Sequence, residues 1–372
     1  MSTTGRGQRA YIGSFTSEGG AGIAVASVDA ETGALSVLHT TDAVPNPSYL
    51  ALAPGGQVLY AVSETDDGAA AALSVADPAR PPAPLGPPVP VRGAVPTHLA
   101  LAAGCLLTAN YGSGSVTALP VRDGGALAEP SAVLRHEGGG PVTDRQEGPH
   151  AHAVVPDPSG RWVLAVDLGT DSVWVYALGE PDAPGEPDAR GGQGVRRAAV
   201  RTVDAPPRAH REARLRPGSG PRHLAFHPRG HRAYVVNELD STVTVCRWDA
   251  ASGTLDALGE VRVVPDGTDV PNFPSEVVVS ADGRFVWVAN RGHDSVATLA
   301  LGASGDTMTL VATTPCGGRW PRDLTLAPSG RHLYAANQRS GEVTWFDIDP
   351  TTGVPTPGGS LAAPAASCVI FA

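Results

Sequence analysis

The sequence contains no lysine, because all 27 of its basic residues are arginine. This absence excludes a lysine Schiff base, a catalytic lysine and the lysine-dependent phosphate loop of nucleotide hydrolases. Codon usage in a high-GC genome explains the bias simply. Its chemical consequence is that any anion held by a permanently charged side chain must be held by arginine.

Charge and long apolar runs are also scarce. Charged residues make up 17% of the 372 residues, and the formal net charge is −10. An acidic chain disfavours nucleic acids and anionic membranes as partners. No apolar run reaches the ~18–20 residues of a transmembrane helix. The polar segment from Met1 to Arg9 has no apolar signal core, so we expect a cytoplasmic protein.

Cysteine is rare and scattered. The chain holds four, without a CxxC pair: Cys105, Cys246, Cys316 and Cys368. We therefore expect buried thiols, and neither a zinc site nor a disulfide framework.

Turn-forming residues are abundant and are arranged in a repeat. The chain has 45 Gly, 35 Pro and 42% hydrophobic residues, which is typical of many short strands around a packed core. A pattern of Pro, apolar strand, Gly- or Pro-containing turn, second apolar strand and Asn or Asp recurs. Its copies begin at Asn46, Val95, His150, Gly220, Phe273 and Trp320. Four asparagines share one position, where we expect them to cap a tight bend: Asn110, Asn237, Asn290 and Asn337.

A second pair of strands follows each copy, so one repeat holds four strands in about 45–55 residues, the period of a propeller blade. The C-terminal copy, PAASCVIFA, is incomplete, and the chain starts with unmatched strands. The N-terminal strands should therefore complete the last blade and close the ring. The sequence predicts an all-β, seven-bladed β-propeller with four-stranded antiparallel blades, in a single domain of residues 1–372. Six or eight blades are the alternatives.

One stretch breaks the period. Residues 179–217 are rich in Pro, Gly and Arg and are longer than the equivalent segments of the other repeats. We expect the outer strand of this blade at residues 198–205. The remainder should be a surface loop, either a solvated insertion or a lid.

The repeat also predicts where side chains meet. In an antiparallel meander, the start of the first strand and the end of the second lie on the same face of the disc, near its axis, where a ligand cavity is expected. The first-strand positions are Ser48, Thr97, His152, Arg222, Ser275 and Arg322. The second-strand positions are Glu64, Tyr111, Leu168, Glu238, Arg291 and Gln338. A purely structural ring would repeat one residue type, whereas this ring varies and is rich in ionisable groups.

Four ring residues on adjacent blades form the candidate catalytic set: His152, Arg222, Glu238 and Arg291. Two arginines can hold an anionic group or stabilise an oxyanion. A glutamate and a histidine beside them can move protons. The structural alternative is a salt bridge from Glu238 to Arg222 or Arg291 that only joins blades.

Further candidates surround this set. Those for substrate binding are His150, Arg322, Glu276, Tyr111, His293 and Gln338. Glu276 shares the next strand position with His98, His223 and Asp323, which either line the channel or tie blades together. The pair of His150 and His152 has no third ligand at a defined spacing, so the sequence predicts no metal site.

Several segments together resemble the lactonase family of seven-bladed propellers, over essentially the whole chain: YIGSFT, GPHAHAVVPDPSGRWVLAVDLGTDSV, GPRHLAFHP with NELDSTV, and VANRGHDSV. That family includes propeller-type 6-phosphogluconolactonases and 3-carboxy-cis,cis-muconate lactonizing enzymes. In the lactonizing enzymes a His, two Arg and a Glu of the central cavity are proposed to act. The resemblance carries these roles to His152, Arg222, Arg291 and Glu238, and it implies no required metal or organic cofactor. The 179–217 insertion departs from the family's compact pattern and leaves the substrate open.

Three functions fit these observations. The leading one is hydrolysis of an anionic sugar lactone such as 6-phosphogluconolactone, with Arg222 and Arg291 on the anion and Glu238 or His152 as base. The second is a cofactor-independent cycloisomerase that closes or opens a lactone on an unsaturated carboxylate. The third is a non-catalytic propeller that binds a ligand or a protein. We expect a small anionic partner, no nucleic acid or membrane, and a monomer or weak homo-oligomer.

Overall fold

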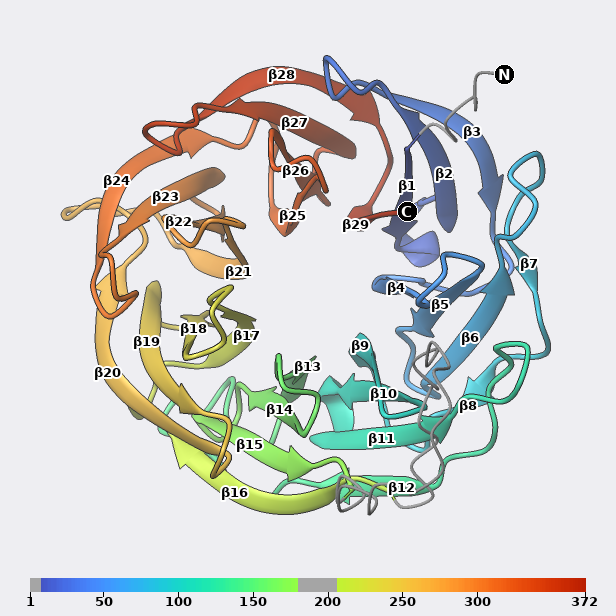
Figure 1. The fold of residues 1–372 in the computed structure, drawn as a ribbon, viewed down its shortest axis with the longest axis horizontal. Helices are drawn as coiled ribbons and strands as arrows, with labels where there is room; N and C mark the ends of the chain where they lie inside the picture. Colours follow the sequence, from blue (N-terminus) through green and yellow to red (C-terminus); the bar gives the residue numbers. More distant parts are fainter. Residues whose placement is uncertain (1–7, 180–205) are drawn as a thin grey trace, which may run out of the picture.

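Seven β-sheets surround a central axis in the computed structural model of the chain (Figure 1). The structure describes residues 8–179 and 206–372. Six of the sheets have four strands, and one has five because its outer edge is split in two. The predicted seven-bladed propeller is therefore confirmed.

Each blade is a meander that runs outward from the axis. The innermost strands are β4 (Leu50–Leu52), β9 (Pro96–Ala102), β13 (Ala151–Pro156), β17 (Pro221–Phe226), β21 (Phe273–Val279), β25 (Pro321–Leu326) and β29 (Ala366–Phe371). The second strands are β5 (Val58–Ser63), β10 (Cys105–Asn110), β14 (Trp162–Asp167), β18 (Arg232–Asn237), β22 (Phe285–Arg291), β26 (His332–Asn337) and β1 (Arg9–Ser14).

The third strands are β6 (Ala69–Ser74), β11 (Ser115–Pro120), β15 (Ser172–Ala177), β19 (Thr242–Asp249), β23 (Ser295–Leu301), β27 (Glu342–Ile348) and β2 (Ile23–Val28). The outer strands are β7 (Ala83–Pro84) with β8 (Val89–Pro90), β12 (Ala132–Arg135), β16 (Arg208–Arg214), β20 (Thr254–Arg262), β24 (Met308–Pro315), β28 (Pro355–Ala362) and β3 (Leu35–Thr41). The described helices are the 3₁₀ turns η1 (Thr16–Glu18) and η2 (Tyr111–Ser113), so no helix of this part of the chain is long and apolar enough to cross a membrane.

The ring closes where the two ends of the chain share a blade. Its strand order is β29-β1-β2-β3, and β29 pairs antiparallel with β1 from Ala10↔Phe371 to Gly13↔Cys368. The predicted closure is confirmed, and it completes a four-stranded blade from the two ends of the chain.

The blade that carries the 179–217 insertion differs from expectation at its outer edge. The strand predicted at residues 198–205 lies outside the described residues. The outer strand that pairs with β15 is β16, a charged segment of sequence RAHREAR.

The apolar core lies in the seams between blades and leaves the axis free. Buried hydrophobic residues form seven clusters, and each cluster joins side chains of two neighbouring blades. One example packs Leu164 and Val175 of one blade against Val235 and Trp248 of the next. Hydrophobic burial therefore holds the disc together without filling its centre.

The four repeated asparagines are fully buried and join the second strand of a blade to its neighbours. Asn110 donates to Thr117 Oγ1 at 2.9 Å, Asn237 to Thr244 Oγ1 at 2.9 Å and Asn337 to Thr344 Oγ1 at 3.0 Å. Asn290 donates to the carbonyl of Val263 at 3.0 Å. Their role is structural, but it consists of bridging between strands, because none of the four has a left-handed backbone.

A repeated polar contact links successive blades at a greater radius. The third residue of four second strands donates a hydrogen bond to a glycine carbonyl in an outer turn of the next blade. The pairs are Tyr60–Gly125, Tyr234–Gly305, Trp287–Gly353 and Tyr334–Gly33, at 2.7–3.0 Å. The glycines have φ between 71° and 91°, and an added Cβ would lie within 3.0 Å of the neighbouring blade. Only glycine fits these turns.

Removing a tyrosine hydroxyl from one of these contacts should weaken the packing between the two blades that it joins. Tyr60→Phe and Tyr334→Phe should each lower the free energy of unfolding by about 1–2 kcal/mol, because each leaves a buried or partly buried carbonyl without its partner. The two sites belong to non-adjacent seams, so the double variant should show the sum within about 0.5 kcal/mol. Urea unfolding measures both values, and a single variant with wild-type stability would show that the contact contributes nothing.

Candidate active site

The axial side chains are positioned by an irregularity shared by the inner strands. Pairing with the second strand skips Thr97 in β9, His152 in β13, Arg222 in β17 and Arg322 in β25, as at a β-bulge. A bulge sets two residues of one strand opposite one residue of its partner and re-aims their side chains. Arg222 with His223, and Arg322 with Asp323, accordingly line the same narrow axial hollow.

One mouth of the channel is a cavity of about 440 Å³, which we call the Arg cavity. It lies at the start of the inner strands and the end of the second strands, as the repeat predicts. Its lining residues are Glu18, Arg145, Glu238, Phe273, Arg291, Trp320, Arg322, Gln338 and Arg339. Four arginines against two glutamates give this lining a formal charge of +2.

Glu238, which directly follows β18, forms ion pairs with three arginines at the Arg cavity. Its carboxylate lies 2.6 Å from Arg145 Nη2, 2.6 Å from Arg291 Nη2 and 3.2 Å from Arg222 Nε. The salt bridge between blades that the sequence offered as the structural alternative is thus present. It does not exclude a ligand site, since the same carboxylate and two of its arginines line the cavity.

The charges around Glu238 decide its ionisation. Burial by itself would raise its pKa, but Arg291, Arg222 and Arg145 outweigh burial and lower the pKa from 4.5 to about 2. Burial and the neighbouring Arg291 lower the pKa of Arg222 to about 9. Glu238 is therefore a carboxylate at neutral pH with little affinity for a proton.

Arg322 is the more open of the ring arginines. Its side chain is 19% exposed, compared with 7% for Arg291 and 3% for Arg222. It lies 3.3 Å from Glu64 and over the ring of Phe15 at 4.9 Å, and it contacts Gln338 at 3.4 Å. Arg222 lies below the cavity, where it donates to the carbonyl of Ser275.

The histidines of the HAH segment occupy different environments. His152 is buried next to His223, with ring centroids 5.2 Å apart, and its Nδ1 has no hydrogen-bond partner in the described part of the chain. Burial and then the charge of Arg222 lower its pKa well below 6.5, so it is neutral at physiological pH. His150 stacks on Tyr111 at 4.4 Å and contacts Glu147 at 3.2 Å, toward the surface.

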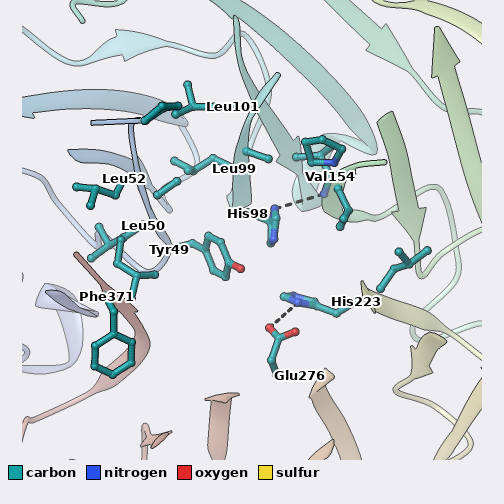
Figure 2. A pocket seen from close by; sticks show the side chains of 17 residues that line it. Tyr49, Leu50, Leu52, His98, Leu99, Leu101, Val154, His223, Glu276 and Phe371 are labelled. Atoms are coloured by element: carbon teal, nitrogen blue, oxygen red, sulfur yellow. Dashed lines mark hydrogen bonds and ion pairs between the residues drawn. The ribbon is translucent and has the colours of Figure 1, made fainter. Parts of the chain in front are cut away.

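The second residues of the bulges lead to the opposite mouth of the channel. Figure 2 shows this opposite pocket, of about 610 Å³, with Tyr49, His98, His223 and Glu276 around a common centre and leucines along one wall. His223 Nδ1 lies 2.6 Å from a carboxylate oxygen of Glu276. Glu276 therefore lies away from the Arg cavity, among groups that join blades.

Glu276 and the buried Asp323 have pKa values shifted in the direction opposite to that of Glu238. Burial raises the pKa of Glu276 to about 7, against the attraction of Arg222. Burial and the charge of Glu276 raise the pKa of Asp323 well above its ordinary value. The two carboxyl groups share a site in which both cannot easily ionise.

Of the remaining candidates, Gln338 lies at the Arg cavity and His293 does not. Gln338 lines the Arg cavity and donates to Glu18 at 2.9 Å. His293 bonds Ser295 Oγ at 2.7 Å within its own turn and is absent from the lining of the cavity. In residues 8–179 and 206–372, no three His, Cys, Asp or Glu side chains are grouped so that they could hold a metal ion.

Sequence reasoning did not name five of the nine lining residues as site candidates: Glu18, Arg145, Phe273, Trp320 and Arg339. Arg145 lies on the connection between β12 and β13, outside the repeat. Trp320 precedes the repeat proline, a position at which Asn46 and Val95 have the same left-handed backbone. The sequence could have indicated Trp320, because it starts a copy of the repeat at the same position as Phe273, which also lines the cavity.

Removal of the anchoring carboxylate should be costly. Glu238→Gln leaves three buried or half-buried guanidinium groups uncompensated, and we expect a loss of about 3–5 kcal/mol in unfolding free energy at pH 7. The wild type should lose this advantage as the pH falls from 4.5 toward 2, because its folded-state pKa is depressed. Chemical denaturation at several pH values measures this, with the exposed Glu137→Gln as control. Equal stability of the two variants would contradict the anchoring role.

The carboxyl pair should have the opposite pH dependence. Folding raises the pKa of Glu276 from 4.5 to about 7, so the folded state binds more protons in this interval and the wild type loses stability as the pH rises through it. The unfolding free energy of the wild type minus that of Glu276→Gln/Asp323→Asn should fall by more than about 1 kcal/mol between pH 4.5 and 8. A pH-independent difference would show that folding does not protonate the pair.

Comparisons with known proteins agree with this architecture. The family model described as "Lactonase, 7-bladed beta-propeller" matches residues 9–371. The 6-phosphogluconolactonase of Bacillus subtilis (strain 168) is 32% identical over 345 residues, which are 92% of this chain and 92% of that protein. An uncharacterized protein of Lactococcus lactis subsp. lactis (strain IL1403) is 29% identical over 366 residues, with 98% and 99% covered.

Solved structures give the same result. The periplasmic gluconolactonase of Pseudomonas aeruginosa superposes with a TM-score of 0.85 at 30% identity, over 98% of each chain. A Lactobacillus plantarum protein superposes with a TM-score of 0.86 at 27% identity, over 99% of this chain and 100% of that one. The chain therefore belongs to the lactonase family of seven-bladed β-propellers.

Proposed function

We propose that this chain hydrolyses an anionic sugar lactone, of the 6-phosphogluconolactone type, in the Arg cavity. The observation that carries the proposal is the cavity itself, whose lining has a formal charge of +2 in a chain of net charge −10. Such a cavity attracts an anion against the field of the whole protein. Relatives named 6-phosphogluconolactonase and gluconolactonase support the choice of a lactone.

In this proposal arginine stabilises the charge that develops on the lactone. Water attacks the carbonyl carbon, the carbonyl oxygen becomes an oxyanion, and the ring C–O bond then breaks to give a hydroxyl and a carboxylic acid that ionises. Arg322, the more exposed ring arginine, and Arg291 are the donors available to that oxyanion. Arg222 acts from below by fixing Glu238.

His152 is the general base in this proposal, and Glu238 is a positioning residue. A carboxylate with a pKa of about 2 that is tied to three arginines accepts a proton poorly. His152 is absent from the lining of the Arg cavity, but it lies beside Tyr111, with ring centroids 5.6 Å apart, and its Nδ1 has no partner among the described residues. Burial lowers its pKa, so it is neutral and can accept a proton. The choice that the sequence left open between these two residues thus falls on the histidine.

The test is acceleration of lactone opening above the spontaneous rate, with 6-phosphogluconolactone and purified protein. His152→Gln should lower kcat by about 10²–10⁴-fold with little change in KM. Arg322→Gln should raise KM as well as lower kcat, because it removes a donor to the bound lactone.

Two controls make this test decisive. His210→Gln changes an exposed histidine of the outer strand β16 and should leave the rate at the wild-type value. The product should gain the mass of one water; an unchanged mass would instead assign the cavity to a cycloisomerase. No acceleration by the wild type would refute the hydrolase.

A further inference from the structure

We infer that Arg339, stacked on Trp320, forms a phosphate subsite at the rim of the Arg cavity, so that the preferred substrates are phosphate monoesters. The inference rests on the proposed function for its substrate and goes beyond it in assigning a place to the phosphate. Neither residue belongs to the ring that the repeat predicts.

The arginines of the cavity differ in what they already hold. Arg145 and Arg291 are each 2.6 Å from Glu238, and Arg322 is 3.3 Å from Glu64. The guanidinium of Arg339 makes no ion pair or hydrogen bond with another side chain in residues 8–179 and 206–372. Unlike the other three arginines of the cavity, Arg339 therefore has none of its side-chain donors engaged by a described side chain.

Stacking fixes Arg339 in a geometry suited to an oxyanion. The guanidinium carbon lies 3.4 Å from the centroid of the Trp320 ring. Contact through the flat face leaves the N–H groups at the edge of the guanidinium free to donate in pairs to phosphate oxygens. The aromatic surface also holds the side chain in place, which reduces the entropy lost on binding.

Trp320 is itself firmly held. Its backbone N–H donates to Asp294 Oδ1 at 2.8 Å, and its carbonyl accepts from the N–H of Gln338 at 3.1 Å. The ring of Phe273 lies 5.9 Å away, and Arg291 approaches the same indole at 5.5 Å. The Trp320 indole therefore contacts both Arg339, at the rim of the Arg cavity, and Arg291, which pairs with Glu238.

The charge of the cavity selects the class of anion. Its lining has a formal charge of +2, and a phosphate monoester carries about −1.5 to −2 at neutral pH. A monocarboxylate would neutralise only half of that charge. Glu18 and Gln338, which are joined by a hydrogen bond of 2.9 Å, suit sugar hydroxyls, because a carboxylate accepts their hydrogen bonds.

Binding of the stable product 6-phosphogluconate, compared with gluconate, tests the subsite without catalysis. By calorimetry, Arg339→Gln should weaken 6-phosphogluconate about tenfold or more, since one charge-assisted contact is lost. The affinity of Arg339→Gln for gluconate should change by less than about twofold. The control is Arg331→Gln, which changes an exposed arginine in the turn between β25 and β26. Its affinities for 6-phosphogluconate and for gluconate should each change by less than about twofold. Trp320→Phe should keep part of the 6-phosphogluconate affinity that Trp320→Leu loses.

Kinetics then separate this inference from the proposed function. KM for 6-phosphogluconolactone should rise about tenfold in Arg339→Gln, with kcat/KM for the unphosphorylated lactone unchanged. Three results would each overturn the subsite. They are an unchanged affinity of Arg339→Gln for 6-phosphogluconate, an equal loss of affinity for 6-phosphogluconate and gluconate, and no binding of 6-phosphogluconate by the wild type. Phosphate-dependent binding through Arg339 without lactone opening would keep the subsite and refute the hydrolase alone.

Discussion

The register shift in the inner strands is the constraint on which the rest of the channel depends. Ordinary alternation would turn one residue in two toward the axis, whereas the shift turns two consecutive residues toward it. Arg222 with His223, and Arg322 with Asp323, are such pairs. This is possible because hydrophobic burial is confined to the seams between blades and leaves the axis to polar groups. One backbone feature thus supplies side chains to both mouths of the channel.

The two mouths compensate buried charge in different ways. Three guanidinium groups surround Glu238 and lower its pKa to about 2, although burial opposes them. Glu276 is also buried, but there burial outweighs the attraction of Arg222, and its pKa is raised to about 7. The same side chain is therefore a fixed anion at one end and a proton carrier at the other.

The sequence predicts the parts of the molecule that repeat. Six copies of one pattern, together with an incomplete seventh and unmatched N-terminal strands, predict seven blades, the closure and the ring positions, because in a propeller equivalent residues occupy equivalent places. The parts that do not repeat could not be predicted in this way. Arg145 enters from a connection between blades, and β16 is a charged edge strand without alternation. Strand periodicity also does not contain the register shift, so it left open whether Glu276 lines the channel or joins blades.

Closure by β29 makes the channel a property of the whole chain. His152, Glu238 and Arg291 all precede β29, but the wall of the channel stays incomplete until Ser367 and Cys368 lie beside β1. That pairing joins residues near opposite ends of the sequence, the kind of distant contact that slows folding most. A growing chain on the ribosome can hold formed blades and every catalytic candidate while it still has no enclosed site. The cavity and its chemistry therefore arise together, in the step that turns an open row of blades into a ring.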